Sequence, residues 1–210
     1  GQIYHETALR YGVNATPEET EKRFREVWLQ RDGMVSLVSH SDEKVEKDWW
    51  RNLVAEVFQV FGTFTDFEAF FEELCEIFGR PDRWRTYPEV EDVLGRVKAS
   101  GKKAAVISNW DSRLFQLVQG LGLEGYFEFV LASAVFGSSK PNPKIFLEGL
   151  HRLNLQPSEA VHIGDSLEDD VQGARASGVD AIFIDRHQEQ DPQRQYPKEL
   201  LIIHSLDDIF

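Results

Sequence analysis

The chain has 210 residues, 41% of them hydrophobic, which is enough for one large domain or two modest ones. Its formal charge of −13 creates a field that repels polyanions, so we expect no nucleic-acid partner, and any phosphate site must be locally positive. No run approaches the roughly 18 apolar residues needed to span a bilayer, and no signal peptide opens the chain. We therefore expect a cytoplasmic protein with a small substrate and no membrane partner; the oligomeric state has no signal in the sequence.

The first eighty residues carry apolar side chains at helical spacing. A helix is expected over residues 3–11, and Thr16-Pro17-Glu18-Glu19 is a capping box with proline at the first helical position. Residues 49–61 form a second apolar stripe, and Thr65 is expected to cap a third helix over residues 67–78. Because helices must bury one face against one another, core packing explains the aromatic side chains of these stripes better than a ligand cleft does.

Proline and charged residues interrupt this pattern from Arg80-Pro81 to Tyr87-Pro88. We expect a domain boundary there, with a helical domain over residues 1–82 and a second domain over residues 83–210. The single cysteine, Cys75, lies within the helical apolar pattern and is expected to be a core thiol rather than a nucleophile.

Beyond the boundary, short apolar strands alternate with helices. Strands are expected over residues 103–108, 127–132, 160–163, 181–184 and 201–203. Helices are expected over residues 88–99, from 111 to about 121, over 143–153 and over 167–177. Such alternation indicates an α/β fold with a parallel sheet covered on both faces, and ligands of such folds bind beyond the carboxyl ends of the strands.

Residues 161–170 are the most informative part of the chain. The apolar run Val161 to Gly164 is followed by a cluster of carboxylates that includes Asp165, Asp169 and Asp170, and Ser166 or Asp165 is expected to cap the next helix. Carboxylates gathered at that point suit Mg²⁺, which is usually held by one or two protein carboxylates plus a substrate phosphate. The alternative is helix capping alone, because acids favour the first turn of a helix.

Two other loops are expected at the same edge of the sheet. Ser108 and Asn109 follow the strand over residues 103–108 and precede a helix, where a hydroxyl and backbone N–H groups form a natural cradle for phosphate. Lys140 stands just before Pro141-Asn142-Pro143, which supplies a helix cap and first turn. An ammonium fixed there would neutralise phosphate, although a loop lysine taken alone is usually solvated.

A strand ending in serine, then Lys-Pro-Asn-Pro before a helix, then a strand followed by Gly-Asp-Ser and further acids, resembles the second, third and fourth motifs of the haloacid dehalogenase superfamily. The resemblance covers roughly residues 88–186, and within the superfamily the chain looks most similar to the haloacid dehalogenase-like hydrolase domain-containing proteins. It implies a Rossmann-like, doubly wound parallel sheet core. Residues 1–80 resemble the helical cap that many members insert after the first motif, so an N-terminal all-helical cap is expected.

The resemblance implies roles for three residues around a small phosphorylated substrate. Ser108, together with the amide of Asn109, would bind the phosphoryl oxygens. Lys140 would stabilise the anionic intermediate and orient the neighbouring carboxylates. Ser108 and Lys140 are therefore expected to be catalytic, and all three residues are expected to bind substrate.

The same resemblance assigns the acids of the fourth motif to a Mg²⁺ cofactor. Asp165 would ligate the ion. Asp170 would be the second acid of the motif, with a catalytic role and contact to the metal through water or Lys140. Asp169 is the alternative for that second acid and is expected to be a metal ligand with Asp165.

The first motif of the superfamily, an apolar strand ending in Asp-x-Asp or a variant, has no counterpart in the sequence. Its first aspartate is the nucleophile, and its strand lies at the centre of the sheet, between the strands that end at Ser108 and Gly164. We expect this strand upstream of residue 1. Otherwise the two flanking strands must pair directly or accept a strand from another chain, because unpaired central backbone groups are costly.

With that aspartate supplied, the resemblance implies hydrolysis of a phosphate monoester through an acyl-phosphate, assisted by magnesium. Metal-free dehalogenation of 2-haloacids is an alternative. It is disfavoured because those enzymes carry uncharged residues where this chain has Gly164-Asp165. A third hypothesis, for the chain without a nucleophile, is a non-catalytic phosphate-binding or interaction module.

Overall fold

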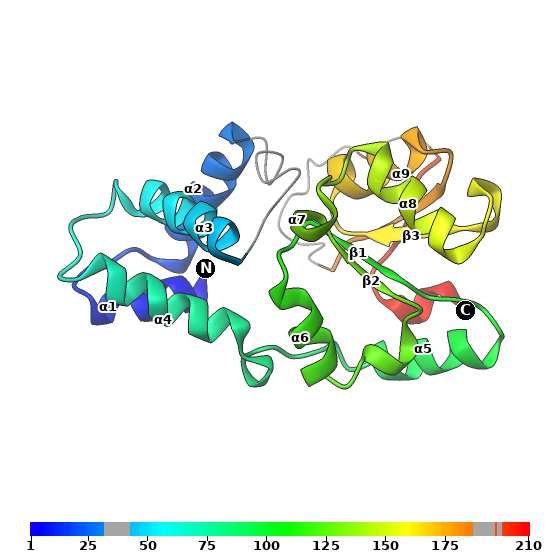
Figure 1. Cartoon of the computed structure of the whole chain (residues 1–210), viewed down its shortest axis with the longest axis horizontal. Coiled ribbons are helices and arrows are strands. Elements are labelled where there is room, and N and C mark those ends of the chain that lie inside the picture. The colour runs from blue at the N-terminus through cyan, green and yellow to red at the C-terminus, as the bar shows by residue number, and fades with distance from the viewer. Residues whose placement is uncertain (32–42, 187–195, 197–198) are drawn as a thin grey trace.

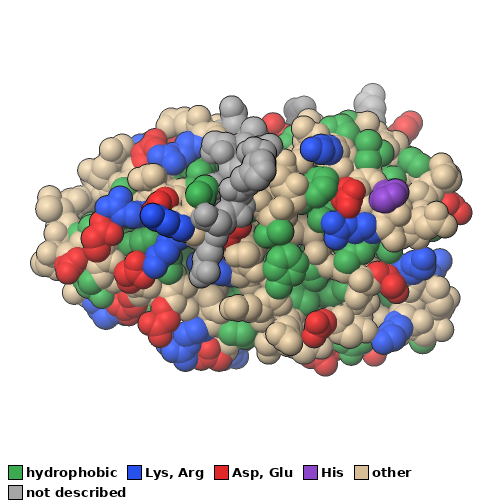
Figure 2. All heavy atoms as spheres, viewed as in Figure 1, with side chains coloured by type: hydrophobic (Ala, Val, Ile, Leu, Met, Phe, Trp, Pro, Cys, Tyr) green, Lys and Arg blue, Asp and Glu red, His purple; other side chains and the backbone are tan. Residues whose placement is uncertain are grey.

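A computed structural model describes residues 1–31, 43–186, 196 and 199–210 of the chain. Figure 1 shows two parts, one made of the first four helices and one in which helices surround short strands. Within the described ranges, no helix combines the length and the apolar character needed to cross a membrane. Acidic and basic side chains are intermingled over the face in Figure 2.

The helical part consists of α1 (Gln2–Arg10), α2 (Pro17–Gln30), α3 (Glu43–Phe58) and α4 (Phe67–Gly79). Helix α1 packs against α2 and α4, and α2 packs against α3. The predicted aromatic stripes meet in its core, where Phe58 and Phe70 are almost fully buried and their rings lie edge to face at 5.2 Å. Most aromatic side chains of these stripes therefore pack in the core of the helical part, as predicted.

Two helix starts test the predicted caps. The capping box at Thr16 is confirmed, because its hydroxyl accepts from the Glu19 amide and the Glu19 carboxylate accepts from the Thr16 amide. The cap predicted for the helix over residues 67–78 is wrong by one residue. Asp66 caps α4 by accepting from the Ala69 amide at 3.0 Å, whereas the Thr65 hydroxyl donates to the Tyr11 carbonyl and ties this loop to the end of α1.

The described residues of the second part form five strands, β1 (Val106–Ser108), β2 (Val130–Ala132), β3 (Val161–Gly164), β4 (Asp180–Ile184) and β5 (Leu201–Ile203). Its helices are α5 (Val90–Ala99), α6 (Arg113–Gly120), α7 (Ser133–Phe136), α8 (Pro143–Leu153), a π-helix (Leu167–Gln172) and α9 (Gly173–Ala176). In Figure 1, α8 and α9 lie on one side of the strands and α5 and α6 on the other.

The first two strands are shorter than the apolar runs that predict them. The Val106 amide still donates to Phe129, and the Glu128 amide donates to Ala104 at 2.8 Å, so the paired backbone extends beyond the regular ladder. Both strands therefore lie where they were predicted, but each begins about three residues later than predicted.

The strand pairs of the described ranges are parallel, as predicted, but the strands fall into two groups. Strands β1 and β2 pair with each other, and β3, β4 and β5 pair in that order. The described residues contain no ladder between β1 and β3. Direct pairing of these two strands, one of the arrangements considered above, is therefore not what the chain adopts.

The two parts have separate hydrophobic clusters. One gathers side chains of the first four helices and takes in Ala134 of α7. The other lies between α8, α9 and the strands, with Ile145, Phe146 and Phe183 almost fully buried. We propose on this basis that residues 1–82 and 83–210 are two domains.

Candidate active site

Two of the predicted loops are joined by a reciprocal pair of hydrogen bonds. The side-chain amide of Asn109 donates to the Lys140 carbonyl at 2.9 Å, and the Lys140 backbone amide donates to Asn109 Oδ1 at 2.8 Å. Ser108 precedes this pair at the end of β1, opposite Ala132 of β2, and is half-buried. The loop after β1 and the loop before α8 therefore have a fixed relative position.

The Lys140 side chain connects these loops to the one after β3. Its ammonium donates to Asp170 Oδ1 at 2.5 Å, and the two side chains are only 12% and 3% exposed. Burial opposes ionisation of Asp170, but the hydrogen bond from His162 and the Lys140 charge outweigh it and lower the pKa of this carboxyl below its usual range. Asp170 is therefore a carboxylate at neutral pH and holds the ammonium in place.

Both oxygens of Asp170 are engaged by protein groups. His162 Nε2 lies 2.8 Å from Oδ1, and the Ser166 amide donates to Oδ2 at 3.0 Å. The space for this carboxylate exists because Gly164 has no side chain, since a Cβ there would overlap Asp170. The geometry fits Asp170 as the partner of Lys140 better than as an open metal ligand.

His162 is a member of the site that the sequence prediction missed. Its ring packs edge to face on Phe146 at 5.1 Å and reaches Asp170. The available signal was a polar side chain within an apolar strand, two residues before Gly164 and hence on the same face of β3.

The segment that carries the acids is not the continuous α-helix predicted over residues 167–177. It begins as a π-helix (Leu167–Gln172), in which the Val171 amide donates to the Ser166 carbonyl five residues earlier, and only then becomes α9. Ser166 caps this segment by accepting from the Asp169 amide at 3.0 Å, so of the two caps considered in the sequence analysis, Ser166 and Asp165, the first is confirmed. Single π-helical turns are rare in proteins, and many of those that do occur lie at functional sites.

The remaining acids form an exposed to half-buried cluster. Asp165 is exposed, and Asp169 is half-buried. Burial, together with the charges of Asp170, Glu168 and Asp165, raises the pKa of Asp169 to about 6, against the opposing effect of Lys140. Negative charge therefore exceeds positive charge at this point.

This donor set fits Mg²⁺. Among the described residues, no group of three or more His, Cys, Asp or Glu side chains is arranged to hold a metal ion. Mg²⁺ does not require one, because it is usually bound through one or two carboxylates and keeps several waters. Asp165 and Asp169 would hold the ion, and its charge would relieve the repulsion that raises the pKa of Asp169.

A second polar cluster, not predicted from the sequence, joins the two parts of the molecule. The Trp50 indole N–H of α3 donates to Asp111 Oδ2 at 2.6 Å, and the Ser112 hydroxyl donates to Glu46 Oε2 at 2.7 Å. The Arg113 guanidinium binds both oxygens of Asp111, which is 1% exposed. Asp111 also accepts from the Arg113 amide at the start of α6, so it stabilises this helix end as well as anchoring the helical part.

A family model of haloacid dehalogenase-like hydrolases matches residues 4–178, which include the loops that carry Ser108, Lys140 and Asp165. The chain belongs to the haloacid dehalogenase-like hydrolase family. This finding confirms the fold class predicted from the sequence, an α/β protein of Rossmann-like type with parallel strands.

Relatives of this hydrolase include both family members of the predicted subgroup and named phosphatases. Human haloacid dehalogenase-like hydrolase domain-containing protein 3 is 32% identical over 207 residues, 96% of this chain and 82% of that protein. Phosphoserine phosphatase of Thermus thermophilus is 38% identical over 125 residues, 58% of this chain and 50% of that protein.

Solved structures that match almost the full length of this chain include a phosphatase and a dehalogenase. One, of a HAD phosphatase from Thermococcus onnurineus, has a TM-score of 0.62 and 26% identity, and the match covers 99% of this chain and 85% of that one. The other, of a 2-haloacid dehalogenase from Pseudomonas syringae, has a TM-score of 0.60 and 25% identity, and the match covers 99% and 88% of the two chains.

Proposed function

We propose that this hydrolase is a Mg²⁺-dependent phosphatase that cleaves a small phosphate monoester through an aspartyl-phosphate. The observation that carries the proposal is the buried ion pair between Lys140 and Asp170. The backbone of Lys140 is also hydrogen-bonded to the side chain of Asn109, in the loop that begins at Ser108. A buried ammonium held beside a phosphate cradle lowers the energy of a transferring phosphoryl group, because it stabilises charge in a site of low dielectric constant.

Each residue has a defined part in this proposal. The Ser108 hydroxyl and the Asn109 amide bind phosphoryl oxygens, and the Lys140 ammonium neutralises them. Asp170 keeps that ammonium charged and oriented, and it is held in turn by His162. The Asn109 side chain, Lys140 and Asp170 are fixed beforehand by their own hydrogen bonds, so this part of the site meets the phosphate without rearrangement.

Asp165 and Asp169 hold Mg²⁺ in this proposal. The bound ion supplies charge neutralisation to the phosphate and to the carboxylates around it. The half-buried position of Asp169 and its raised pKa support this role, since a carboxylate repelled by its neighbours gains most from a cation.

The nucleophile is proposed to be an aspartate on a strand that lies between β1 and β3. Strand β1 forms its ladder with β2, and β3 forms its ladder with β4, so among the described residues the edges of β1 and β3 that would face this strand carry no ladder. Unpaired backbone groups in the middle of a sheet are costly, which supports a strand at that place.

The phosphatase names of relatives support the reaction class. The Thermus relative is named for phosphoserine, and the Thermococcus structure is described as a HAD phosphatase. These names describe what the relatives do, so the substrate of this hydrolase is a separate question.

The test is phosphate release from a broad panel of monoesters by the native protein, with any residues that its gene encodes before Gly1. We expect release that requires Mg²⁺ and that falls about a hundredfold or more in Lys140→Met. Lys144→Met is the matched control, because Lys144 is an exposed lysine four residues along the same segment. Absence of release from every ester, or undiminished release by Asp165→Ala, would refute the proposal.

Metal-free dehalogenation of 2-haloacids is the second candidate, because one similar structure is a 2-haloacid dehalogenase. The carboxylate cluster around Asp165 and Asp169 disfavours it. Without a metal ion, these negative charges would repel both the anionic haloacid and the departing halide. Chloride release from 2-chloropropionate in the presence of EDTA would reverse this ranking.

A further inference from the structure

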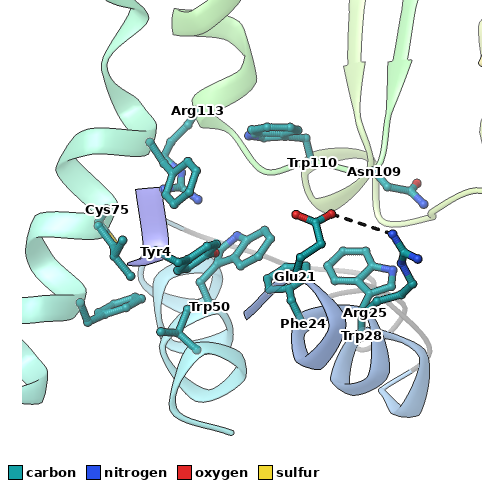
Figure 3. Close-up of a pocket in the computed structure, with 14 residues that line it drawn as sticks. Tyr4, Glu21, Phe24, Arg25, Trp28, Trp50, Cys75, Asn109, Trp110 and Arg113 are labelled. Atoms are coloured by element: carbon teal, nitrogen blue, oxygen red, sulfur yellow. Dashed lines mark ion pairs between the residues drawn. The ribbon is translucent and has the colours of Figure 1, made fainter. Parts of the chain in front are cut away.

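A cavity of about 420 Å³ lies between the helical part and the loop that follows β1 (Figure 3). Side chains of the first four helices form one side, and Asn109, Trp110 and Arg113 form the other. In Figure 3, Asn109 lies toward one end of the cavity and Tyr4 toward the opposite end. Since Asn109 is bonded to the Lys140 backbone, the cavity extends from the proposed phosphate loop into the helical part.

Aromatic rings supply much of the cavity wall. The Phe24 ring is nearly parallel to those of Trp28 and Trp50, with interplanar angles of 17° and 21° and centroids 6.0 and 6.4 Å apart. The hydrogen bond from the Trp50 indole to Asp111 fixes one of these faces. Flat, fixed aromatic faces favour a planar ring as ligand, and the volume is in the usual range for small-molecule pockets, roughly 300–1,000 Å³.

Each charged group of the wall already has an ionic partner. The Arg113 guanidinium is bound to both oxygens of the buried Asp111 and lies 5.9 Å from the Trp50 ring centroid. Arg25 pairs with Glu21 at 3.9 Å, and both side chains are exposed. A second anionic group on a ligand would therefore compete with carboxylates already in place, and a cationic group would meet two guanidiniums.

We propose that this cavity receives the alcohol part of a phosphate monoester and selects an uncharged, planar aromatic alcohol. The position of the phosphate rests on the proposed phosphatase function, whereas the binding of the ring depends on the cavity alone. Sugar hydroxyls would lose water against the aromatic part of the wall, where the ring faces offer them no hydrogen-bond partners, and such burial is unfavourable. The ammonium and carboxylate of an amino-acid phosphate would meet the same obstacle.

The test is calorimetric titration of the native protein in EDTA, which prevents turnover, with four probes. These are 2-naphthyl phosphate, glycerol 3-phosphate, phosphocholine and 2-naphthol, the last of which carries no phosphate. We expect 2-naphthyl phosphate to bind about tenfold or more tightly than glycerol 3-phosphate or phosphocholine, from the stacking and burial of its ring. We also expect 2-naphthol to bind.

Phe24→Leu removes one aromatic face, and Phe61→Leu is its matched control. Both phenylalanines are half-buried in the helical part and contact other rings, but only Phe24 lines the cavity. Phe24→Leu should weaken 2-naphthyl phosphate and 2-naphthol about tenfold and leave glycerol 3-phosphate within about twofold. Phe61→Leu should leave all probes within about twofold, and melting curves should show that both variants fold.

The ranking of the four probes on the unsubstituted protein decides the matter even where a variant does not fold. Equal binding of naphthyl and glycerol esters, tighter binding of phosphocholine, or no binding of 2-naphthol overturns the inference. An equal loss in the two leucine variants does so as well. Failure of the proposed phosphatase function has a different signature: no ester is hydrolysed, yet 2-naphthol and its phosphate still bind.

Discussion

His162 and Asp170 are eight residues apart in sequence, and His162 Nε2 lies 2.8 Å from the same carboxylate oxygen that accepts the Lys140 ammonium. One oxygen of a buried acid therefore joins strand β3, the π-helix and the loop before α8.

Lys140→Met should destabilise the protein by about 3 kcal/mol, because it leaves the Asp170 carboxylate buried without its cation. The free energy of unfolding from urea titration measures this loss. Asp170→Asn added to Lys140→Met should recover part of it, since the amide has no charge to compensate. Lys144→Met, at an exposed position, should change stability by less than about 0.5 kcal/mol. Strictly additive losses in the double variant would contradict a direct charge pairing.

Gly164→Ala should destabilise the protein by about 1–3 kcal/mol, because the new Cβ would overlap the Asp170 carboxylate. The matched control is Gly95→Ala in α5, where an added Cβ meets no atom within 4 Å. That control should be neutral or stabilise by up to about 1 kcal/mol, since alanine is the better helix former. Thermal melting distinguishes the two, and equal shifts in the same direction would show that the contact at Gly164 is not tight.

Asp169→Asn should stabilise the metal-free protein at pH 7.5. Its folded pKa, raised to about 6, lies above the unfolded value of about 3.9, so the folded state favours the protonated form. The unfavourable contribution of this group is therefore present above pH 6 and disappears as the pH falls through 6 toward 4. After a discount for solvent screening, the expected gain is about 1 kcal/mol at pH 7.5.

The measurement for Asp169→Asn is urea unfolding in EDTA at pH 7.5 and at pH 4.5. The difference between the variant and the unsubstituted protein should shrink at the lower pH. Asp180→Asn, an exposed carboxylate at the start of β4, is the control and should show no such dependence. A variant that is less stable than the unsubstituted protein at pH 7.5 would refute the repulsion argument.

Addition of Mg²⁺ should raise the melting temperature of the protein but not that of Asp165→Asn. A ligand that binds only the folded state at tenfold excess over its Kd stabilises it by about 1.4 kcal/mol. Asp180→Asn removes the same charge at the opposite end of the sheet and should retain the full Mg²⁺ response. Equal responses in the two asparagine variants would place the ion elsewhere.

Much of this fold follows from local pattern. Short apolar runs separated by amphipathic helices predict parallel strands, and the range of α8 is the same in prediction and structure, because Asn142 and Pro143 start it and Asn154 ends it in a left-handed conformation. The loops that carry Ser108, Lys140 and Asp165 were predicted to meet at one edge of the sheet, and the contacts of Asn109 and Lys140 join the loops on either side of β2.

Other features depend on information that periodicity does not contain. A π-helix and an α-helix have similar apolar patterns over a single turn, so the start of the 167–177 segment was assigned wrongly. Thr65 and Asp66 are both good caps, and only the contact of Thr65 with Tyr11 decides between them. The Trp50–Asp111 bond joins two parts of the molecule, and neither residue carries a local sign of the other.

That bond also bears on how a ligand enters. Because Asp111 accepts from both Trp50 and Arg113, moving the helical part away from the strands would break a hydrogen bond between the two parts and expose a guanidinium–carboxylate pair to water. Separation of the two parts therefore costs free energy, and we expect a bulky ligand that requires such separation to enter and leave at the rate at which this bond breaks. Diffusion through the solvent would then be the faster step.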